Sequence, residues 1–201
     1  MRYLYLIVVV SLLAGCFGGG AAVPQDQFYH LADISGEVVQ ASKPFDVVAV
    51  SPLQSDVLHQ ERAILYTEQS ASLKLNTYYY HHWADVPGQM IQENLIAYLR
   101  KAGFAKTVVR YGERPRVDAQ ITGYIQRFER ILGQGKPRVA VRLELSFISR
   151  EPGRPRTLTK VYALEQEATD NSMEASVAAF SRVLQKIYAH FVADVLRESG
   201  A

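Results

Sequence analysis

Hydrophobic and polar residues alternate along much of the chain, which is typical of β-strands with one solvated face. In the clearest case, every second residue from Val139 to Phe147 is apolar, and those between are small, polar or charged. Glycine- and proline-rich reversals at Gly133–Pro137 and Pro152–Pro155 favour antiparallel pairing. The pattern predicts strands at Phe28–Leu31, Phe45–Val50, Arg62–Thr67, Leu73–Tyr79, Ala105–Val109, Val117–Phe128, Val139–Ile148 and Leu158–Leu164.

Two other segments carry apolar residues at the spacing of an amphipathic helix. The first is expected to begin at Asp85 as the cap, with Pro87 in the first turn, and to end at Gly103. The second is expected to run from Asn171 to about Glu198, with Glu174 completing a capping box. Its expected buried stripe is Val177, Phe180, Leu184, Ile187, Tyr188, Phe191 and Val195.

Together these elements predict an α+β fold. The sheet is expected to be mostly antiparallel, with the two amphipathic helices packed on one of its faces.

The N-terminus carries a short apolar run. Arg2 precedes Leu4–Leu13, which has the length of a secretory signal and is too short to span a bilayer. The motif Leu13-Ala14-Gly15-Cys16 resembles the lipobox of bacterial lipoproteins, in which the cysteine is lipidated and becomes the new N-terminus. Cys16, the only cysteine of the chain, is therefore the candidate lipidation site, and residues 1–15 are the expected signal peptide. The alternatives are a conventionally cleaved signal with a stray cysteine, or a cysteine whose thiol belongs to the core.

The segment after this cysteine is small, glycine-rich and polar, so residues 16–27 are expected to form the lipidated N-terminus and a flexible tether. Residues 28–201 then form one domain, because removal of the signal leaves 186 of the 201 residues. Phe17 stands where enterobacterial lipoproteins retained in the inner membrane carry Asp. By that resemblance, the protein is expected in the outer membrane.

The charge balance argues against nucleic acid as a partner. The chain has 22 Lys and Arg against 20 Asp and Glu, and the signal removes one Arg. The mature protein is therefore nearly neutral and has no basic stripe. No second apolar run approaches the length of a spanning helix, so attachment to the membrane is expected through acyl chains alone.

No motif of a known catalytic site is present. The sequence lacks Gly-x-Ser-x-Gly, His-Glu-x-x-His and a phosphate-binding loop. His81 and His82 are neighbours in an extended segment, where adjacent side chains point to opposite faces, so they are not expected to share a metal ion. The sequence thus predicts a protein that is not an enzyme and that carries neither metal nor cofactor.

The densest unusual stretch is Tyr78-Tyr79-Tyr80-His81-His82-Trp83. Regular alternation predicts that Tyr79 and Trp83 enter the core while Tyr78 and Tyr80 face outward. Outward tyrosines suit a protein interface or the headgroup region of a membrane. Tyr78 and Tyr80 are therefore the candidate partner-contact residues.

Several short motifs follow one another along the chain: the lipobox, Tyr29-His30-Leu31, Val47–Pro52, Arg62–Tyr66 and Trp83–Pro87. Their order resembles the ABC-type transport auxiliary lipoproteins, including the paraquat-inducible protein C type. None of the motifs is catalytic.

The resemblance implies a lipid-anchored outer-membrane protein that faces the periplasm. Its implied partner is a mammalian-cell-entry (MCE) domain protein, with which it would move lipids between the two membranes; homo-oligomerisation is left open. The alternative is a lipoprotein that assembles or chaperones outer-membrane components.

Overall fold

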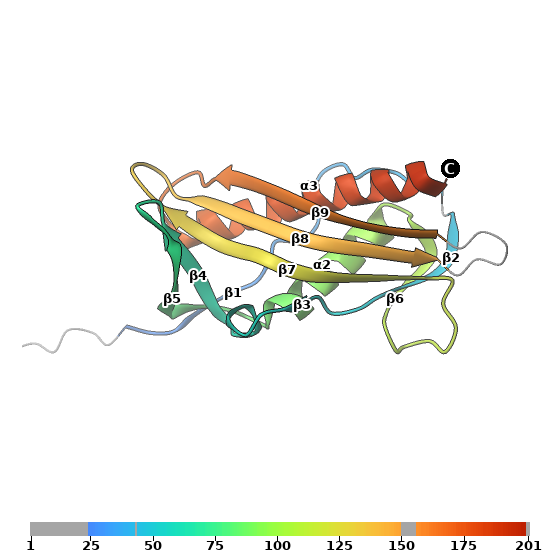
Figure 1. The fold of residues 1–201 in the computed structure, drawn as a ribbon, viewed down its shortest axis with the longest axis horizontal. Coiled ribbons are helices and arrows are strands. Elements are labelled where there is room, and N and C mark those ends of the chain that lie inside the picture. Colours follow the sequence, from blue (N-terminus) through green and yellow to red (C-terminus); the bar gives the residue numbers. More distant parts are fainter. Residues whose placement is uncertain (1–23, 43, 150–155, 200–201) are drawn as a thin grey trace, which may run out of the picture.

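A computed structural model describes residues 24–42, 44–149 and 156–199 (Figure 1). The signal peptide, Cys16 and the turn at Pro152–Pro155 lie outside the described residues. The elements, in chain order, are β1 (Gln27–Tyr29), β2 (Phe45–Val50), β3 (Gln54–Ser55), the 3₁₀ turn η2 (Leu58–Gln60), β4 (Ala63–Glu68), β5 (Ala71–Trp83), α2 (Pro87–Lys101), β6 (Ala105–Arg110), β7 (Ala119–Leu132), β8 (Arg138–Ser149), β9 (Arg156–Glu167) and α3 (Met173–Ser199).

On one edge of β7, the strands β7, β8 and β9 form an antiparallel meander, as the alternation and the reversals between them predicted; the strand before them, β6, pairs elsewhere. β7 pairs with β8 from Ala119↔Ser149 to Ile131↔Arg138, and β8 pairs with β9 along its whole length. The apolar residues of β8 at odd positions, such as Leu143, are buried against the helices. The even positions lie on the open face of the sheet.

The other edge of β7 is shared by three shorter strands, β2, β3 and β4, all parallel to it. β6 extends the sheet beyond β2, again in parallel, while β5 pairs antiparallel with β4. The sheet is therefore mixed, and the predicted α+β class is confirmed. The parallel pairs join strands that are separated by a long connection, as when β6 pairs with β2 after the chain has passed through β4, β5 and α2.

The first helix has the expected ends except for its cap. Pro87 occupies the first turn, and Gly103 follows with φ 62°, the left-handed conformation that favours glycine. The prediction that Asp85 caps the helix is wrong. The cap position is Val86, and Asp85 Oδ1 accepts a hydrogen bond from the Val86 N–H at 2.7 Å.

The second helix begins two residues later than predicted. The N–H of Ala175 donates to Ser172 Oγ at 3.0 Å, so Ser172 and not Asn171 is the cap. The expected stripe from Val177 to Val195 is buried. It packs with Trp83 and Phe128 in one core, in which the centroids of Trp83 and Phe128 are 5.1 Å apart.

Residues 30–42 cross the two helices on the side away from the sheet (Figure 1). The N–H of Ala32 donates to Ser181 Oγ of α3 at 2.9 Å, and its carbonyl oxygen accepts from Asn94 Nδ2 of α2 at 3.1 Å. The N–H of Ala41 donates to the carbonyl oxygen of Ala102 at 2.8 Å. The chain after β1 is thus fixed to both helices. Within the described residues, no helix combines the length and apolar character needed to cross a bilayer.

Candidate functional site

The tyrosine-rich stretch lies at the end of β5, but its side chains are not arranged as regular alternation predicted. Trp83 is buried as expected, whereas the prediction that Tyr79 is buried is wrong, because its side chain is 85% exposed. Between the pairs Ala63↔His82 and Leu65↔Thr77, β5 has three more residues than β4. An odd number of extra residues inverts the alternation, which explains why Tyr79 and Trp83 differ.

Tyr78 is partly buried and packs against the core, so it does not face outward as predicted. Its hydroxyl accepts a hydrogen bond from Arg130 Nη1 at 2.8 Å, and its ring lies 4.5 Å from that of Tyr66 and 5.5 Å from that of His81. Burial raises the pKa of Tyr78, and the Arg130 charge opposes this rise. Of the two predicted contact residues, Tyr80 is the better presented to a partner, since it is 45% exposed.

Arg130 joins three elements at this site. It is a buried residue of β7, and its Nη2 donates to the carbonyl oxygen of Asn171, just before α3, at 2.6 Å. Its Nε has no hydrogen-bond partner among the described residues. The guanidinium therefore ties β5 to β7 and to the start of α3 through neutral acceptors.

The two neighbouring histidines attach β1 to β5. β1 runs parallel to the end of β5, with Gln27↔His81 and Tyr29↔Trp83 in register. Tyr29 Oη and His81 Nδ1 are 3.0 Å apart, while His82 Nε2 lies 3.6 Å from Asp26 Oδ1. Burial lowers the pKa of His81. Each histidine thus contacts a different residue, and no group of three potential metal ligands occurs among the described residues.

A second site is formed by His59, which lies in η2, and Asp56, which lies just before it. His59 is buried, and its Nδ1 is 2.9 Å from Asp56 Oδ1. Its Nε2 is buried and has no hydrogen-bond partner among the described residues, and His59 lines a cavity of about 290 Å³. In a nucleophile–base pair, a hydroxyl or thiol occupies that position. The described residues place none there.

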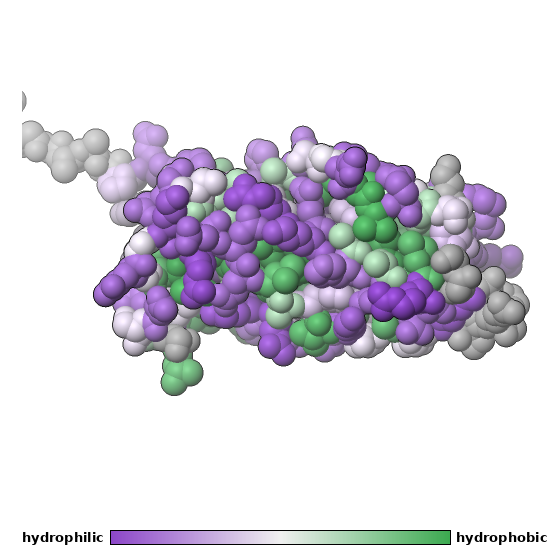
Figure 2. Space-filling model, turned by 90° about the horizontal axis from the view of Figure 1, so that it is seen from above, coloured by the Kyte–Doolittle hydropathy of each residue, from purple (hydrophilic) through white to green (hydrophobic). Residues whose placement is uncertain are grey.

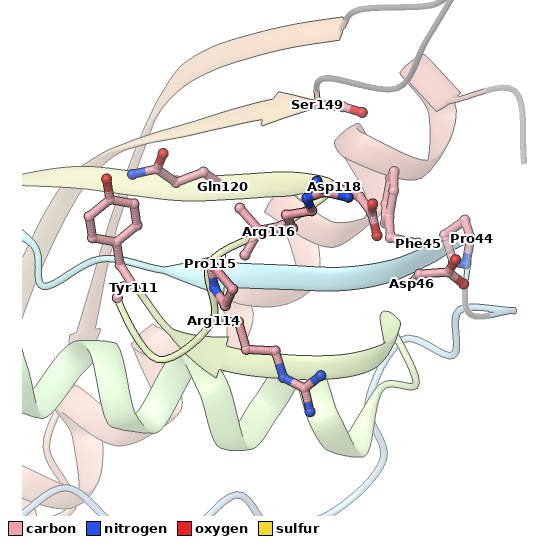
Figure 3. A pocket seen from close by; sticks show the side chains of 12 residues that line it. Pro44, Phe45, Asp46, Tyr111, Arg114, Pro115, Arg116, Asp118, Gln120 and Ser149 are labelled. Atoms are coloured by element: carbon pink, nitrogen blue, oxygen red, sulfur yellow. The ribbon is translucent and has the colours of Figure 1, made fainter.

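A larger cavity of about 830 Å³ lies at the end of the molecule opposite the β4–β5 hairpin, under the loop that joins β6 to β7 (Figure 3). Its acids already have partners: Asp46 binds Lys106 at 2.6 Å, and Asp118 Oδ2 accepts from the N–H of Val47 at 2.7 Å. Arg114 points away from the other labelled side chains (Figure 3). The lining combines both charges with proline and aromatic residues, without a nucleophile–base pair.

A third cluster surrounds Asp194 in a groove between β9 and α3. The buried carboxylate accepts from Lys160 Nζ at 2.7 Å and from the Tyr162 hydroxyl at 2.9 Å, and it lies 3.1 Å from Arg197. The hydrogen bond from Lys160, followed by that from Tyr162, holds the pKa of Asp194 below its usual range. Every oxygen of the carboxylate is occupied within the protein. The cluster therefore joins α3 to β9.

The sequence reasoning did not single out Arg130, His59 with Asp56, or Asp194. One signal was available for Asp194, which is a charged residue between Phe191 and Val195 of the buried stripe. A charge at such a position requires partners when it is buried.

Residues 29–191 match the family described as the ABC-type transport auxiliary lipoprotein component. No curated protein sequence matches the chain. Among solved structures, protein XCC0632 from Xanthomonas campestris superposes with a TM-score of 0.71 at 16% identity, covering 87% of this chain and 97% of that one. A protein described only as uncharacterized gives a TM-score of 0.61 at 14% identity over 87% of this chain and 98% of its own. At these identities the likeness concerns the fold.

Proposed function

Because the chain belongs to the family of ABC-type transport auxiliary lipoprotein components, we propose that it is the membrane-anchored, non-enzymatic accessory protein of an MCE-type lipid transport system. The single observation that carries this proposal is the family match, which spans nearly all of the described residues. In this proposal the protein faces the periplasm from the outer membrane. Residues 28–201 form its one domain.

The proposed anchor is Cys16 with its acyl chains. It is the only cysteine of the chain and follows a signal-like segment. A single acyl chain binds a membrane marginally, while two or more hold stably, at about 0.8 kcal/mol for each buried methylene. The first described residues run into β1 at the end that carries the β4–β5 hairpin, so the anchor belongs to that end (Figure 1).

The arrangement of the described side chains supports an accessory role without catalysis. His59 has an acidic partner but no nucleophile at Nε2, and the acids of the large cavity are occupied by protein groups. The proposed contact with an MCE-domain protein is centred on Tyr80. Tyr78, two residues before Tyr80, is fixed by the hydrogen bond that its hydroxyl accepts from Arg130, and this keeps the end of β5 in place.

Metabolic labelling with a radioactive fatty acid tests the anchor. Wild-type protein is expected to take up the label, and Cys16→Ser to lose it, because the thiol is the acylation point. Label that persists in Cys16→Ser would contradict the anchor.

Titration with the purified MCE-domain protein tests the contact. Tyr80→Ser is expected to weaken binding about tenfold if the ring is a hot spot. Tyr111→Ser is the matched control, since Tyr111 is a 60% exposed tyrosine at the opposite end. Equal affinities of the two variants would remove Tyr80 from the interface. Co-purification with assembly factors of outer-membrane components, in place of an MCE-domain protein, would favour the alternative role.

A further inference from the structure

Two large side chains of β5 project into solvent. Leu73 is fully exposed, and Tyr79 is 85% exposed. Both lie at register shifts of the strand against β4, and with the exposed Thr77 between them they form what we call the β5 stripe (Leu73, Thr77 and Tyr79). Figure 2 shows a hydrophobic projection at the left-hand end of the molecule, the end that carries the β4–β5 hairpin.

The Tyr79 end of the stripe lies close to the point where the chain arrives from the proposed anchor. Gln27 pairs with His81, only two residues from Tyr79 and therefore about 7 Å away along the strand. The eleven residues from Cys16 to Asp26 can span at most about 35–40 Å when fully extended. The stripe is therefore within the reach that the tether allows between the domain and the bilayer surface.

We propose that the β5 stripe contacts the headgroup region of the membrane in which the acyl chains of Cys16 are inserted. The inference rests on the lipid anchor of the proposed function and adds the orientation of the domain. The hairpin end meets the lipid surface, and the large cavity under the β6–β7 loop points away from it.

The side chains of the β5 stripe suit the headgroup region of a membrane. Tyrosine rings favour the membrane–water interface, where the ring contacts apolar groups while the hydroxyl stays hydrated. Residues 71–77 of β5 pair with β4 on one side, and no described strand lies on the other side of residues 71–80. Such an open edge cannot enter the hydrocarbon core, because its backbone groups would lose their hydrogen bonds to water. The headgroup region is wet and permits it.

The test uses full-length acylated protein with a new cysteine at one of three positions. The variants are Leu73→Cys, Tyr79→Cys and, as the control at the far end, Tyr111→Cys. Because acylation occupies the Cys16 thiol, an environment-sensitive fluorophore can be attached at the new position alone. The labelled proteins are floated with vesicles of phosphatidylethanolamine and phosphatidylglycerol that contain a small fraction of nitroxide-labelled phosphatidylcholine, and circular dichroism checks folding.

All three variants are expected to float with the vesicles. The nitroxide lipid should quench the fluorophore at positions 73 and 79 at least about twofold more than at 111, since interfacial groups lie roughly 5–10 Å into the headgroup and acyl boundary. Flotation with equal quenching at all three positions would overturn the orientation and leave the anchor standing. A blue-shifted but unquenched label at 73 and 79 would show that protein covers the stripe, which also overturns the inference. Failure to float would overturn the anchor, and the inference with it.

Discussion

Replacement of Asp194 by Ala should destabilise the fold by about 2–4 kcal/mol. The largest part is the buried hydrogen bond from the Tyr162 hydroxyl to Oδ2, since such bonds to a charged group contribute about 1.5–3 kcal/mol. Lys160 and Arg197 are half or more exposed, so their ion pairs add only about 0.2–1 kcal/mol each. If the free energy of unfolding falls by roughly 2 kcal/mol for each molar of urea, the urea concentration at the unfolding midpoint should fall by about 1–2 M.

Urea unfolding can be followed through Trp83, the only tryptophan of the chain, which is packed against Phe128 and Phe180. Asp194→Asn should cost less than Asp194→Ala, because its amide oxygen can still accept from Tyr162. The matched control is Glu198→Ala, an exposed acid on the same helix, whose effect should stay within about 0.5 kcal/mol.

The same cluster gives a pH dependence with a defined sign. A carboxyl whose pKa is lowered by folding stabilises the protein above its unfolded pKa, and this contribution disappears as the pH falls through the folded pKa. The difference in the free energy of unfolding between wild type and Asp194→Ala should therefore be fully present at pH 7 and shrink below about pH 4. An Asp194→Ala midpoint equal to that of wild type at pH 7, or a difference that grows in acid, would refute the reasoning.

Three further variants test other parts of the fold, each by thermal unfolding monitored by circular dichroism. Gly88→Ala should destabilise by more than about 1 kcal/mol, because a Cβ there would lie 2.2 Å from the backbone oxygen of Leu53, and a wild-type melting temperature would contradict that close approach. Ser172→Ala should cost about 1 kcal/mol as a lost helix cap, whereas Asn171→Ala should cost little; equal effects would argue against Ser172 as the cap. Trp83→Ala should lower the free energy of unfolding by about 3–5 kcal/mol because it leaves a cavity in the core, and Trp83→Phe should lower it clearly less. A small effect of Trp83→Ala would show that neighbouring side chains move into the vacated space.

The sequence predicted the elements whose residues themselves carry the periodic signal. Val139–Ile148 and the stripe from Val177 to Val195 were assigned correctly because burial on one face imposes a period of two or of 3.6 residues. The placement of Tyr79 could not be read in this way. Its exposure depends on a register shift against β4, which is a property of the pairing between two strands.

Some corrections concern choices between chemically equivalent neighbours. Asn171 and Ser172 are both good caps, and only the backbone path selects Ser172. The hydrogen-bond partners of Arg130 come from β5 and from the segment before α3, so no pattern of neighbouring residues predicts them. The buried site chemistry thus depends on contacts between distant parts of the chain, whereas the helices and long strands are indicated by local periodicity.

The sharing of one edge of β7 by β2, β3 and β4 sets the order in which the protein can fold. All three strands precede β7 in the chain; β3 and β4 find their parallel neighbour only when β7 has been synthesised, whereas β2 can first pair with β6. Until then the strand pairs open to the described residues are β4 with β5, β1 with β5 and, after α2, β2 with β6. Contacts of such long sequence separation form slowly, because loop closure costs entropy before any pairing rewards it. The centre of the sheet therefore cannot form before β7, which ends at Leu132, is available for pairing.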